Sequence, residues 1–254
     1  MSRTFEPVFV GCSDWHLAES AYVNRDVMGD AIDAVTRIVD YACEHNLPVV
    51  ASGDLFDAAR PPATVVAAAL QQIDRLQEHG LGFYYTQGQH DVDREFPWLS
   101  LHPWATHLHR QSFDIGDVRV YGIDWVPSGR ITAELEAVPS GTHVVAAHQV
   151  WCDFMGSRGE PDALFSSVPN AHCLLTGDFH EHTSVKAIGA TGLPMLVLSP
   201  GSAAMQSISE PADKAFWVVG RNDGGEIDAR SVYYPTRPVL RYTLTNEQDM
   251  TDWS

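Results

Sequence analysis

Hydrophobic and polar positions follow two alternating periods along the first half of the chain. Short apolar runs, typical of buried strands, lie at residues 7–13, 47–53 and 81–88. Between these runs, apolar residues recur at helical spacing over 26–46 and 63–80, and the second helix is expected to end at Gly80. Because single helices separate the strands, we expect parallel pairing through right-handed crossovers.

The second half of the chain is richer in strand patterns. Residues 142–148 and 171–177 read as two buried strands. Three hairpins are predicted, at 112–126, at 184–200 with a turn at Gly192, and at 214–235 with a turn around Gly224 and Gly225. We therefore predict an α/β protein with one domain over residues 1–235. Residues 236–254 are too few for a second domain and are expected to form an exit arm or the start of a capping region.

Polar side chains follow five of the predicted strands, at the point where each strand ends. They are Asp14 and His16, Asp54 and Asp57, Gln89 and His90, the single His148, and finally Asp178, His180 and His182. In open α/β sheets the ligand site lies beyond the carboxyl ends of the strands. We therefore expect these five groups to converge on one edge.

The side-chain types in these groups suit a particular chemistry. Three aspartates offer hard oxygen ligands, and three histidines offer imidazole nitrogens. Mixed oxygen and nitrogen ligands suit manganese, iron or zinc better than calcium. About seven ligands exceed what one tetrahedral ion requires and suit two ions that share a bridging carboxylate. Two ions about 3.5–4 Å apart can bind a phosphate oxygen and activate a bridging water for phosphoester hydrolysis.

The order and spacing of these motifs resemble those of the calcineurin-like metallophosphoesterases. Within that superfamily the chain is most similar to the double-strand-break repair nucleases of the SbcD type. The motifs that carry the resemblance are SDWHL, GDLFD, GQHD, LLTGDFHEH and LSPGSAAMQSISEPADKAFWVV, and they span residues 7 to about 235. The resemblance implies two facing mixed β-sheets flanked by helices, a four-layer α/β/β/α sandwich.

The resemblance also implies roles for individual residues. It assigns one metal ion to Asp14, His16 and His180, a second ion to Gln89, His148 and Asp178, and a bridging position to Asp54. His90 is implied as the catalytic imidazole that stabilises the transition state or protonates the leaving oxygen. Asp57 would support a ligand or hold the loop after Asp54.

Two positions depart from the family pattern. The family has asparagine where this chain has Gln89, so the amide oxygen lies more than about one ångström farther from the backbone. The family has histidine where this chain has Asp178, and this added negative charge favours manganese over softer ions. In an alternative alignment His180 and His182 form the ligand pair, and Asp178 is not a ligand.

Composition changes this picture only in part. The net charge of −17 argues against a protein that coats nucleic acid with a basic surface, although metal ions can supply local positive charge. Arg60 and Arg94 follow motif loops and are candidates for contacting DNA phosphates. His102, His107 and His109 are expected to lie in a solvated loop. The four cysteines form no CxxC pair, and no export signal or membrane span is recognised, so we expect a cytoplasmic protein.

The leading prediction is a manganese-dependent DNA exonuclease and single-strand endonuclease of DNA repair and recombination. The resemblance further implies a homodimer and a coiled-coil SMC-like ATPase partner. One alternative is a phosphodiesterase for a nucleotide or cyclic nucleotide. Another is a slow scaffold subunit that anchors the ATPase.

Overall fold

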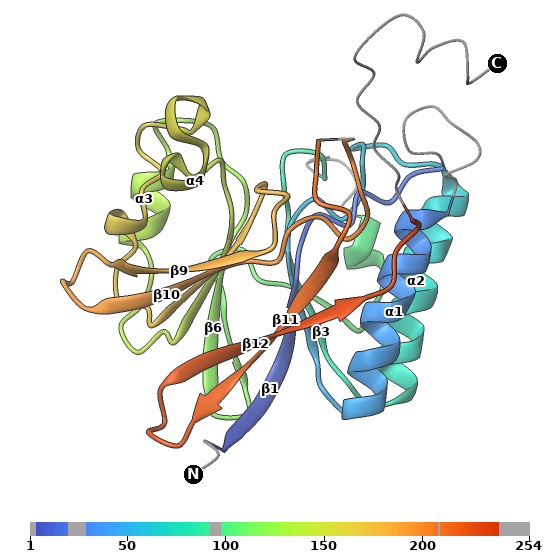
Figure 1. The fold of residues 1–254 in the computed structure, drawn as a ribbon, viewed down its shortest axis with the longest axis horizontal. Helices are drawn as coiled ribbons and strands as arrows, with labels where there is room; N and C mark the ends of the chain where they lie inside the picture. Colours follow the sequence, from blue (N-terminus) through green and yellow to red (C-terminus); the bar gives the residue numbers. More distant parts are fainter. Residues whose placement is uncertain (1–3, 20–28, 92–97, 208, 239–254) are drawn as a thin grey trace, which may run out of the picture.

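Two six-stranded β-sheets face each other in the computed structural model, which describes residues 4–19, 29–91, 98–207 and 209–238 (Figure 1). The first sheet has the order β12–β11–β1–β2–β3–β4, and the second has the order β5–β6–β7–β8–β10–β9. The first sheet consists of β1 (Phe5–Cys12), β2 (Val49–Ser52), β3 (Phe83–Thr86), β4 (Ala105–His107), β11 (Lys214–Asn222) and β12 (Ile227–Tyr234). The second consists of β5 (Ser112–Ile115), β6 (Val118–Ile123), β7 (Val144–His148), β8 (Cys173–Gly177), β9 (Thr183–Ile188) and β10 (Pro194–Ser199).

Helices cover the outer faces of both sheets and complete four layers (Figure 1). The longer ones, α1 (Asp30–His45) and α2 (Ala63–Glu78), lie against the first sheet. The shorter ones, α3 (Ile131–Glu136) and α4 (Cys152–Met155), lie on the side of the second sheet. Three 3₁₀ turns, η3 (Trp98–Leu101), η4 (Gly156–Arg158) and η5 (Phe165–Ser167), complete the elements. The predicted fold class is confirmed.

The helical periodicity of α1 explains its position. Its buried residues are Ala34, Val35, Ile38, Val39 and Ala42, which form one stripe that packs on the first sheet. The chain leaves α1 through Asn46, which adopts a left-handed conformation with φ 54°, and leaves α2 through Gly80 with φ 71°. Asparagine and glycine tolerate this conformation at helix ends. Residues 26–28 of the predicted first helix lie outside the described residues, and Gly29 precedes the first helical residue, Asp30.

Three apolar cores hold the layers together. The core between the two sheets includes Phe9, Val50, Leu175 and Trp217, all of them buried. The other two cores lie between each sheet and its helices. Both faces of the central strands are therefore buried, which explains the continuous apolar runs seen in the sequence.

Strand direction places the site. In the first sheet β1, β2, β3 and β4 are parallel neighbours, as are β6, β7, β8 and β10 in the second. The predicted hairpins β5–β6, β9–β10 and β11–β12 are antiparallel, as expected. The loops after β1, β2, β3, β7 and β8 therefore carry the polar motifs beyond the carboxyl ends of the strands.

The expectation of a solvated loop over His102–His109 is wrong. Residues 105–107 form β4, which pairs in parallel with β3, and His102 is buried and bonded to Asp74 at 2.9 Å. A three-residue strand with polar side chains has no apolar run for sequence analysis to detect. Among the described residues, no helix has the length and apolar character needed to span a bilayer.

Candidate metal centre

The backbone itself is unusual where the polar motifs lie. Asp14, His16, Asp54 and Asp178 all have positive φ, at 50°, 43°, 49° and 73°. They are four of the seven non-glycine residues with positive φ in the described ranges. Such conformations cost free energy and persist only where the surroundings impose them, and they concentrate at functional sites. The strand ends are therefore shaped to point these four side chains in particular directions.

One group of ligand atoms brings together Asp14, His16 and His180. The Nε2 atoms of His16 and His180 are 3.3 Å apart, and Asp14 Oδ1 lies 3.9 Å and 3.7 Å from them. The Nδ1 atom of His16 faces Asp57 Oδ1 at 3.1 Å, and Nδ1 of His180 faces Glu210 Oε1 at 2.8 Å. When each Nδ1–H donates to its carboxylate, both neutral rings turn an Nε2 lone pair toward the other. A cation between the two rings would relieve that repulsion.

A second group consists of Asp14, Asp54 and His148, all of them buried. His148 Nδ1 donates to the carbonyl oxygen of Ser52 at 2.7 Å, and its Nε2 lies 3.3 Å from Asp54 Oδ2. Asp54 Oδ2 also lies 3.8 Å from His16 Nε2, so Asp54 faces both groups. This is the position that a bridging carboxylate requires.

Gln89 and Asp178, the two departures from the family pattern, touch each other. Gln89 Nε2 donates to Asp178 Oδ1, and the backbone N–H of Asp178 donates to Asp14 Oδ1 at 3.0 Å. The amide oxygen of Gln89 remains buried without a hydrogen-bond partner. The longer amide and the carboxylate therefore form one local arrangement.

The donor set fits a divalent cation. Buried polar atoms almost always have hydrogen-bond partners. Four of the seven exceptions in the described part of the chain are Asp14 Oδ2, Asp54 Oδ2, Gln89 Oε1 and His148 Nε2. These atoms belong to the motif residues, and each carries a lone pair that can coordinate a metal.

Burial and charge also favour a cation at this place. Burial alone would lower the pKa of His148, but the carboxylates of Asp54 and Asp14 raise that pKa to about 10. Burial alone would raise the pKa of Asp54, but His148 and His16 lower it to about 2. In the metal-free protein a proton on His148 Nε2, the ring nitrogen that does not bond to Ser52, therefore partly neutralises the carboxylates, and Nε2 regains its lone pair when that proton leaves. Metal binding must displace that proton, so metal affinity falls as the pH falls.

His90 lies beside these groups and is the most exposed imidazole among them, at 42%. Its backbone N–H donates to Asp54 Oδ1 at 2.9 Å, and its Nδ1 donates to the carbonyl oxygen of Asp57 at 3.1 Å. Its Nε2 lies 3.9 Å from Asp54 Oδ2. The loop thus holds the ring so that Nε2 can exchange a proton with a bound molecule.

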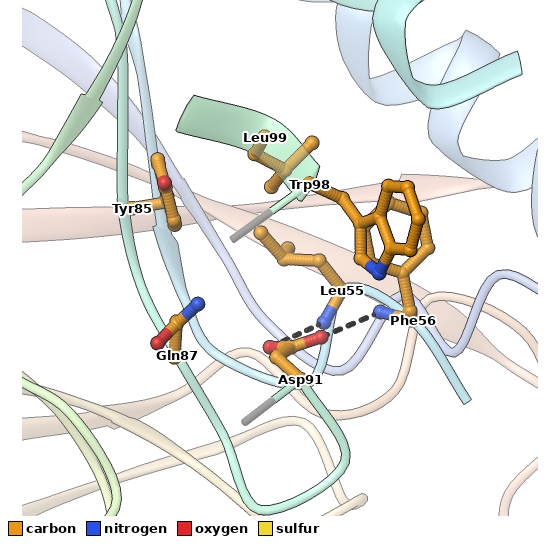
Figure 2. Close-up of a pocket in the computed structure, with 7 residues that line it drawn as sticks. All are labelled: Leu55, Phe56, Tyr85, Gln87, Asp91, Trp98 and Leu99. Atoms are coloured by element: carbon orange, nitrogen blue, oxygen red, sulfur yellow. Dashed lines mark hydrogen bonds between the residues drawn. The ribbon is translucent and has the colours of Figure 1, made fainter. Parts of the chain in front are cut away.

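Asp91 ties the loop that follows β3 to the loop that follows β2. Its buried carboxylate accepts the backbone N–H groups of Leu55 at 3.0 Å, Phe56 at 2.8 Å and Gly88 at 3.0 Å. Figure 2 shows the first two bonds, beside a small pocket that Tyr85 also lines. Asp91 therefore holds the backbone directly after Asp54 and the backbone before Gln89 and His90.

Position 88 requires glycine, because the backbone there lies directly against Asp54. A Cβ atom on Gly88 would lie 2.1 Å from Asp54 Oδ1 and 2.5 Å from Asp54 N, closer than atoms can approach. We expect Gly88→Ala to displace Asp54, to abolish metal binding and to lower the free energy of unfolding by at least about 1–3 kcal/mol. Urea unfolding and calorimetric metal titration check this. Gly224→Ala in the exposed β11–β12 turn, where the nearest atom is 3.2 Å away, is the control. Equal effects of the two changes would contradict the assignment.

Glu210, which bonds to the ring of His180, was not predicted from the sequence. Glu210 accepts from His180 Nδ1 at 2.8 Å, from Lys214 Nζ at 2.8 Å and from Ser202 Oγ at 2.8 Å. Burial would raise the pKa of Glu210, but its bonds to His180 and Lys214 lower that pKa to about 2. The i,i+4 spacing of Glu210 and Lys214 was the available signal.

We expect Glu210→Gln to weaken metal binding about 10–100-fold, because the carboxylate no longer orients the His180 ring. The change also leaves the buried Lys214 ammonium without its counter-charge, at a cost of about 3–5 kcal/mol. The double variant Glu210→Gln/Lys214→Met should recover stability but not metal affinity, as measured by thermal unfolding and calorimetry. Recovery of both stability and metal affinity would show that Glu210 only neutralises Lys214 and does not orient His180. Glu181→Gln, in the same depression, is the matched control.

The remaining candidates lie elsewhere. His182 Nδ1 faces the Pro200 carbonyl oxygen at 3.0 Å, its Nε2 faces Ser231 Oγ at 2.8 Å, and its ring stacks on Trp217. This geometry favours Asp178 and His180 over the alternative alignment. Arg60 is exposed and does not line the depression over the ligand groups, and Arg94 lies outside the described residues.

The ligand groups open into a depression on the surface. Besides His16, Asp54, Gln89, His90, Asp178, His180 and Glu210, it is lined by Met155, Arg158, Phe179, Glu181 and Ser209. A bound molecule would therefore meet Asp54, Gln89 and the ring of His90.

Comparison with known proteins identifies relatives for most of the chain. The chain is 28% identical over 233 residues to the DNA double-strand break repair protein Mre11 of Haloferax volcanii, and the match covers 89% of this chain and 52% of that protein. For Mre11 of Methanosarcina mazei the identity is 26%, with 91% and 39% covered. For Mre11 of Sulfolobus acidocaldarius it is 30% over 176 residues, with 64% and 46% covered. The chain thus spans about half, or less, of the length of these curated relatives.

No family model matches the chain. One solved structure superimposes with a TM-score of 0.54 at 12% sequence identity, covering 89% of this chain and 99% of the other. At that identity the likeness concerns the fold alone.

Proposed function

We propose that this chain, a homologue of the Mre11 DNA double-strand break repair proteins as its motifs predicted, is a metal-dependent DNA phosphodiesterase. The observation that carries the proposal is the set of buried, unpartnered ligand atoms on Asp14, Asp54, Gln89 and His148. They lie close to the paired Nε2 atoms of His16 and His180, and two of the four residues, Asp54 and Gln89, line an open depression.

Seven residues would hold two divalent ions. Asp14, His16 and His180 would bind one ion; Gln89, His148 and Asp178 would bind the other; Asp54 would bridge them. Two bound ions supply Lewis acidity toward the phosphodiester and a nucleophilic water at neutral pH. The hard carboxylate and amide oxygens beside imidazoles favour Mn²⁺ as the native ion.

The chain's own contribution centres on His90. With Nδ1–H donated to the Asp57 carbonyl oxygen, a second proton on this imidazole would reside on Nε2, which faces the depression. From there the ring can donate a hydrogen bond to the phosphate or pass the proton to the leaving oxygen. Asp57 and Glu210 would hold the rings of His16 and His180 in their tautomers.

The wider context follows as part of the same proposal. A role in DNA double-strand break repair is proposed from the names of the Mre11 relatives. Exonuclease and single-strand endonuclease action, recombination, homodimerisation and an SMC-like ATPase partner are proposed because the family resemblance implies them. The four free cysteines support a reducing compartment such as the cytoplasm. Arg60 and Arg94 remain proposed DNA contacts.

Substrate comparison tests the proposal against the small-molecule alternative. With saturating Mn²⁺, we expect kcat/KM for a single-stranded oligonucleotide to exceed that for cyclic nucleotides and for bis(4-nitrophenyl) phosphate. Higher kcat/KM for a cyclic nucleotide would favour the alternative. Tight binding of an ATPase subunit, with no loss of function in His90→Asn, would favour the scaffold reading.

The contact between Gln89 and Asp178 leads to a prediction about the family pattern. Although the family pattern that the motifs resemble has asparagine at position 89, Gln89→Asn alone should weaken binding of one ion about tenfold or more. The shorter side chain withdraws its oxygen and leaves Asp178 Oδ1 without its donor. The double variant Gln89→Asn/Asp178→His should recover affinity, because the two positions are coupled. Calorimetric titration with Mn²⁺ measures both, and additive losses would contradict the coupling.

A further inference from the structure

The lining of the depression combines a cation with an aromatic side chain. Arg158 in η4 lines it, together with Phe179 and Met155. Arg158 is the only arginine or lysine among the described residues that line the depression. The other charged groups there include Asp178, Glu181 and Glu210, so Arg158 stands out in an otherwise acidic lining.

The guanidinium of Arg158 is available to a ligand. It is exposed and makes no hydrogen bond or ion pair within the described parts of the chain. Two other exposed arginines are paired: Arg37 pairs with Asp33 at 2.9 Å, and Arg119 pairs with Asp114 at 2.8 Å. In a chain with a net charge of −17, a cation left unpaired beside the candidate metal centre points to an anionic ligand.

The backbone that presents Arg158 is held firmly. Cys152 N–H donates to the Ala163 carbonyl oxygen at 2.9 Å, and Phe165 N–H donates to Asp153 Oδ2 at 2.8 Å. Gly159 packs so closely that an added Cβ would lie 2.3 Å from the Cα atom of Cys152. The turn is therefore folded back onto α4, and the side chain of Arg158 is exposed.

Phe179 belongs to an aromatic stack. Its ring lies parallel to that of Phe154, with centroids 4.6 Å apart and an interplanar angle of 13°. Phe154 in turn contacts Phe165 edge to face, with centroids 4.9 Å apart. The stack braces Phe179 from behind, and Phe179 lines the depression with the neighbouring Arg158.

We propose that Arg158 and Phe179 form a subsite for the nucleotide next to the scissile phosphate of single-stranded DNA. Arg158 binds the adjoining phosphate, and Phe179 packs against the base, which needs no particular sequence because every base has an apolar face. The subsite rests on the proposed function and specifies how that function favours a polynucleotide over a small phosphodiester.

Binding of a fluorescent oligothymidylate, followed by anisotropy in saturating Mn²⁺, tests the subsite. All variants are made in a His90→Asn background, and salt is varied between about 50 and 200 mM. Arg158→Ala should weaken binding about tenfold and reduce the slope of log K against log salt by about 0.7, the value of one phosphate contact on a single strand. Arg158→Lys should retain the slope. Phe179→Leu should weaken binding without changing the slope.

Arg119→Ala is the control, because Arg119 carries the same charge but lies near the start of β6, away from the carboxyl ends of the strands. It should change neither the affinity for the oligothymidylate nor the salt slope. Calorimetric Mn²⁺ titration checks that each variant retains its ions. Equal effects of Arg158→Ala and Arg119→Ala, or no binding by any protein, would overturn the subsite. Arg158-dependent binding without DNA cleavage by the wild-type chain would leave the subsite standing and remove the nuclease function. DNA cleavage by the wild-type chain, with a salt slope that Arg158→Ala does not change, would leave the nuclease function standing and remove the subsite.

Discussion

His90→Asn is expected to lower kcat for phosphodiester hydrolysis by about 10²–10⁴-fold while Mn²⁺ binding is retained. The ring makes its own bonds to the loop and is not one of the seven proposed ligands, and asparagine can still donate to the Asp57 carbonyl oxygen. Steady-state kinetics and calorimetric titration measure the two effects separately.

The leaving group identifies what His90 does. If the imidazole protonates the leaving oxygen, the loss should be larger for DNA, whose alkoxide needs a proton, than for bis(4-nitrophenyl) phosphate. Equal losses would indicate transition-state stabilisation instead. His79→Asn is a matched control, because His79 Nδ1 also donates to a backbone carbonyl oxygen but lies at the end of α2. Loss of metal binding in His90→Asn would contradict the assignment and make His90 a ligand.

Asp54→Asn is expected to abolish high-affinity binding of both ions. Asp54 Oδ2 faces His148 Nε2 at 3.3 Å and His16 Nε2 at 3.8 Å, so one neutralised carboxylate removes negative charge from both groups. The wild-type chain should gain about 2.7 kcal/mol of stability at a metal concentration a hundred times the dissociation constant. The variant should gain almost none at the same concentration.

Thermal unfolding with and without Mn²⁺ measures this gain. Asp124→Asn is a suitable control, because Asp124 is a largely buried carboxylate that accepts the backbone N–H of Gln87 near the same loops but does not line the depression. A full metal-dependent gain in stability for Asp54→Asn would rule out the bridging role.

The sequence predicted the parts of the site that follow from strand order. Asp14, Asp54 and Asp178 follow parallel strands and His148 ends one, and the ends of neighbouring parallel strands share an edge of the sheet. The hairpin turns at Gly192 and Gly225 were also predictable, because glycine readily adopts the positive φ that tight turns require. Both glycines have positive φ in the structure.

Other parts depend on tertiary contacts that leave no periodic signal. Glu210 lies in an irregular segment and reaches His180 only because the chain folds back between β10 and β11. Arg158 belongs to no motif, and its placement depends on the close packing of Gly159 on α4. Nothing in the sequence linked the departures from the family pattern at Gln89 and Asp178. Only the structure shows that the two side chains are in direct contact.

The most direct test of the account is cleavage of end-labelled single- and double-stranded DNA by the purified chain in Mn²⁺. Parallel reactions contain a chelator, the His90→Asn variant or the Asp54→Asn variant. The wild-type chain is expected to cleave DNA, and the chelator and both variants are expected to abolish or nearly abolish that cleavage. Absence of cleavage by a folded chain that binds two Mn²⁺ ions would contradict the proposed function, as would cleavage that survives the chelator.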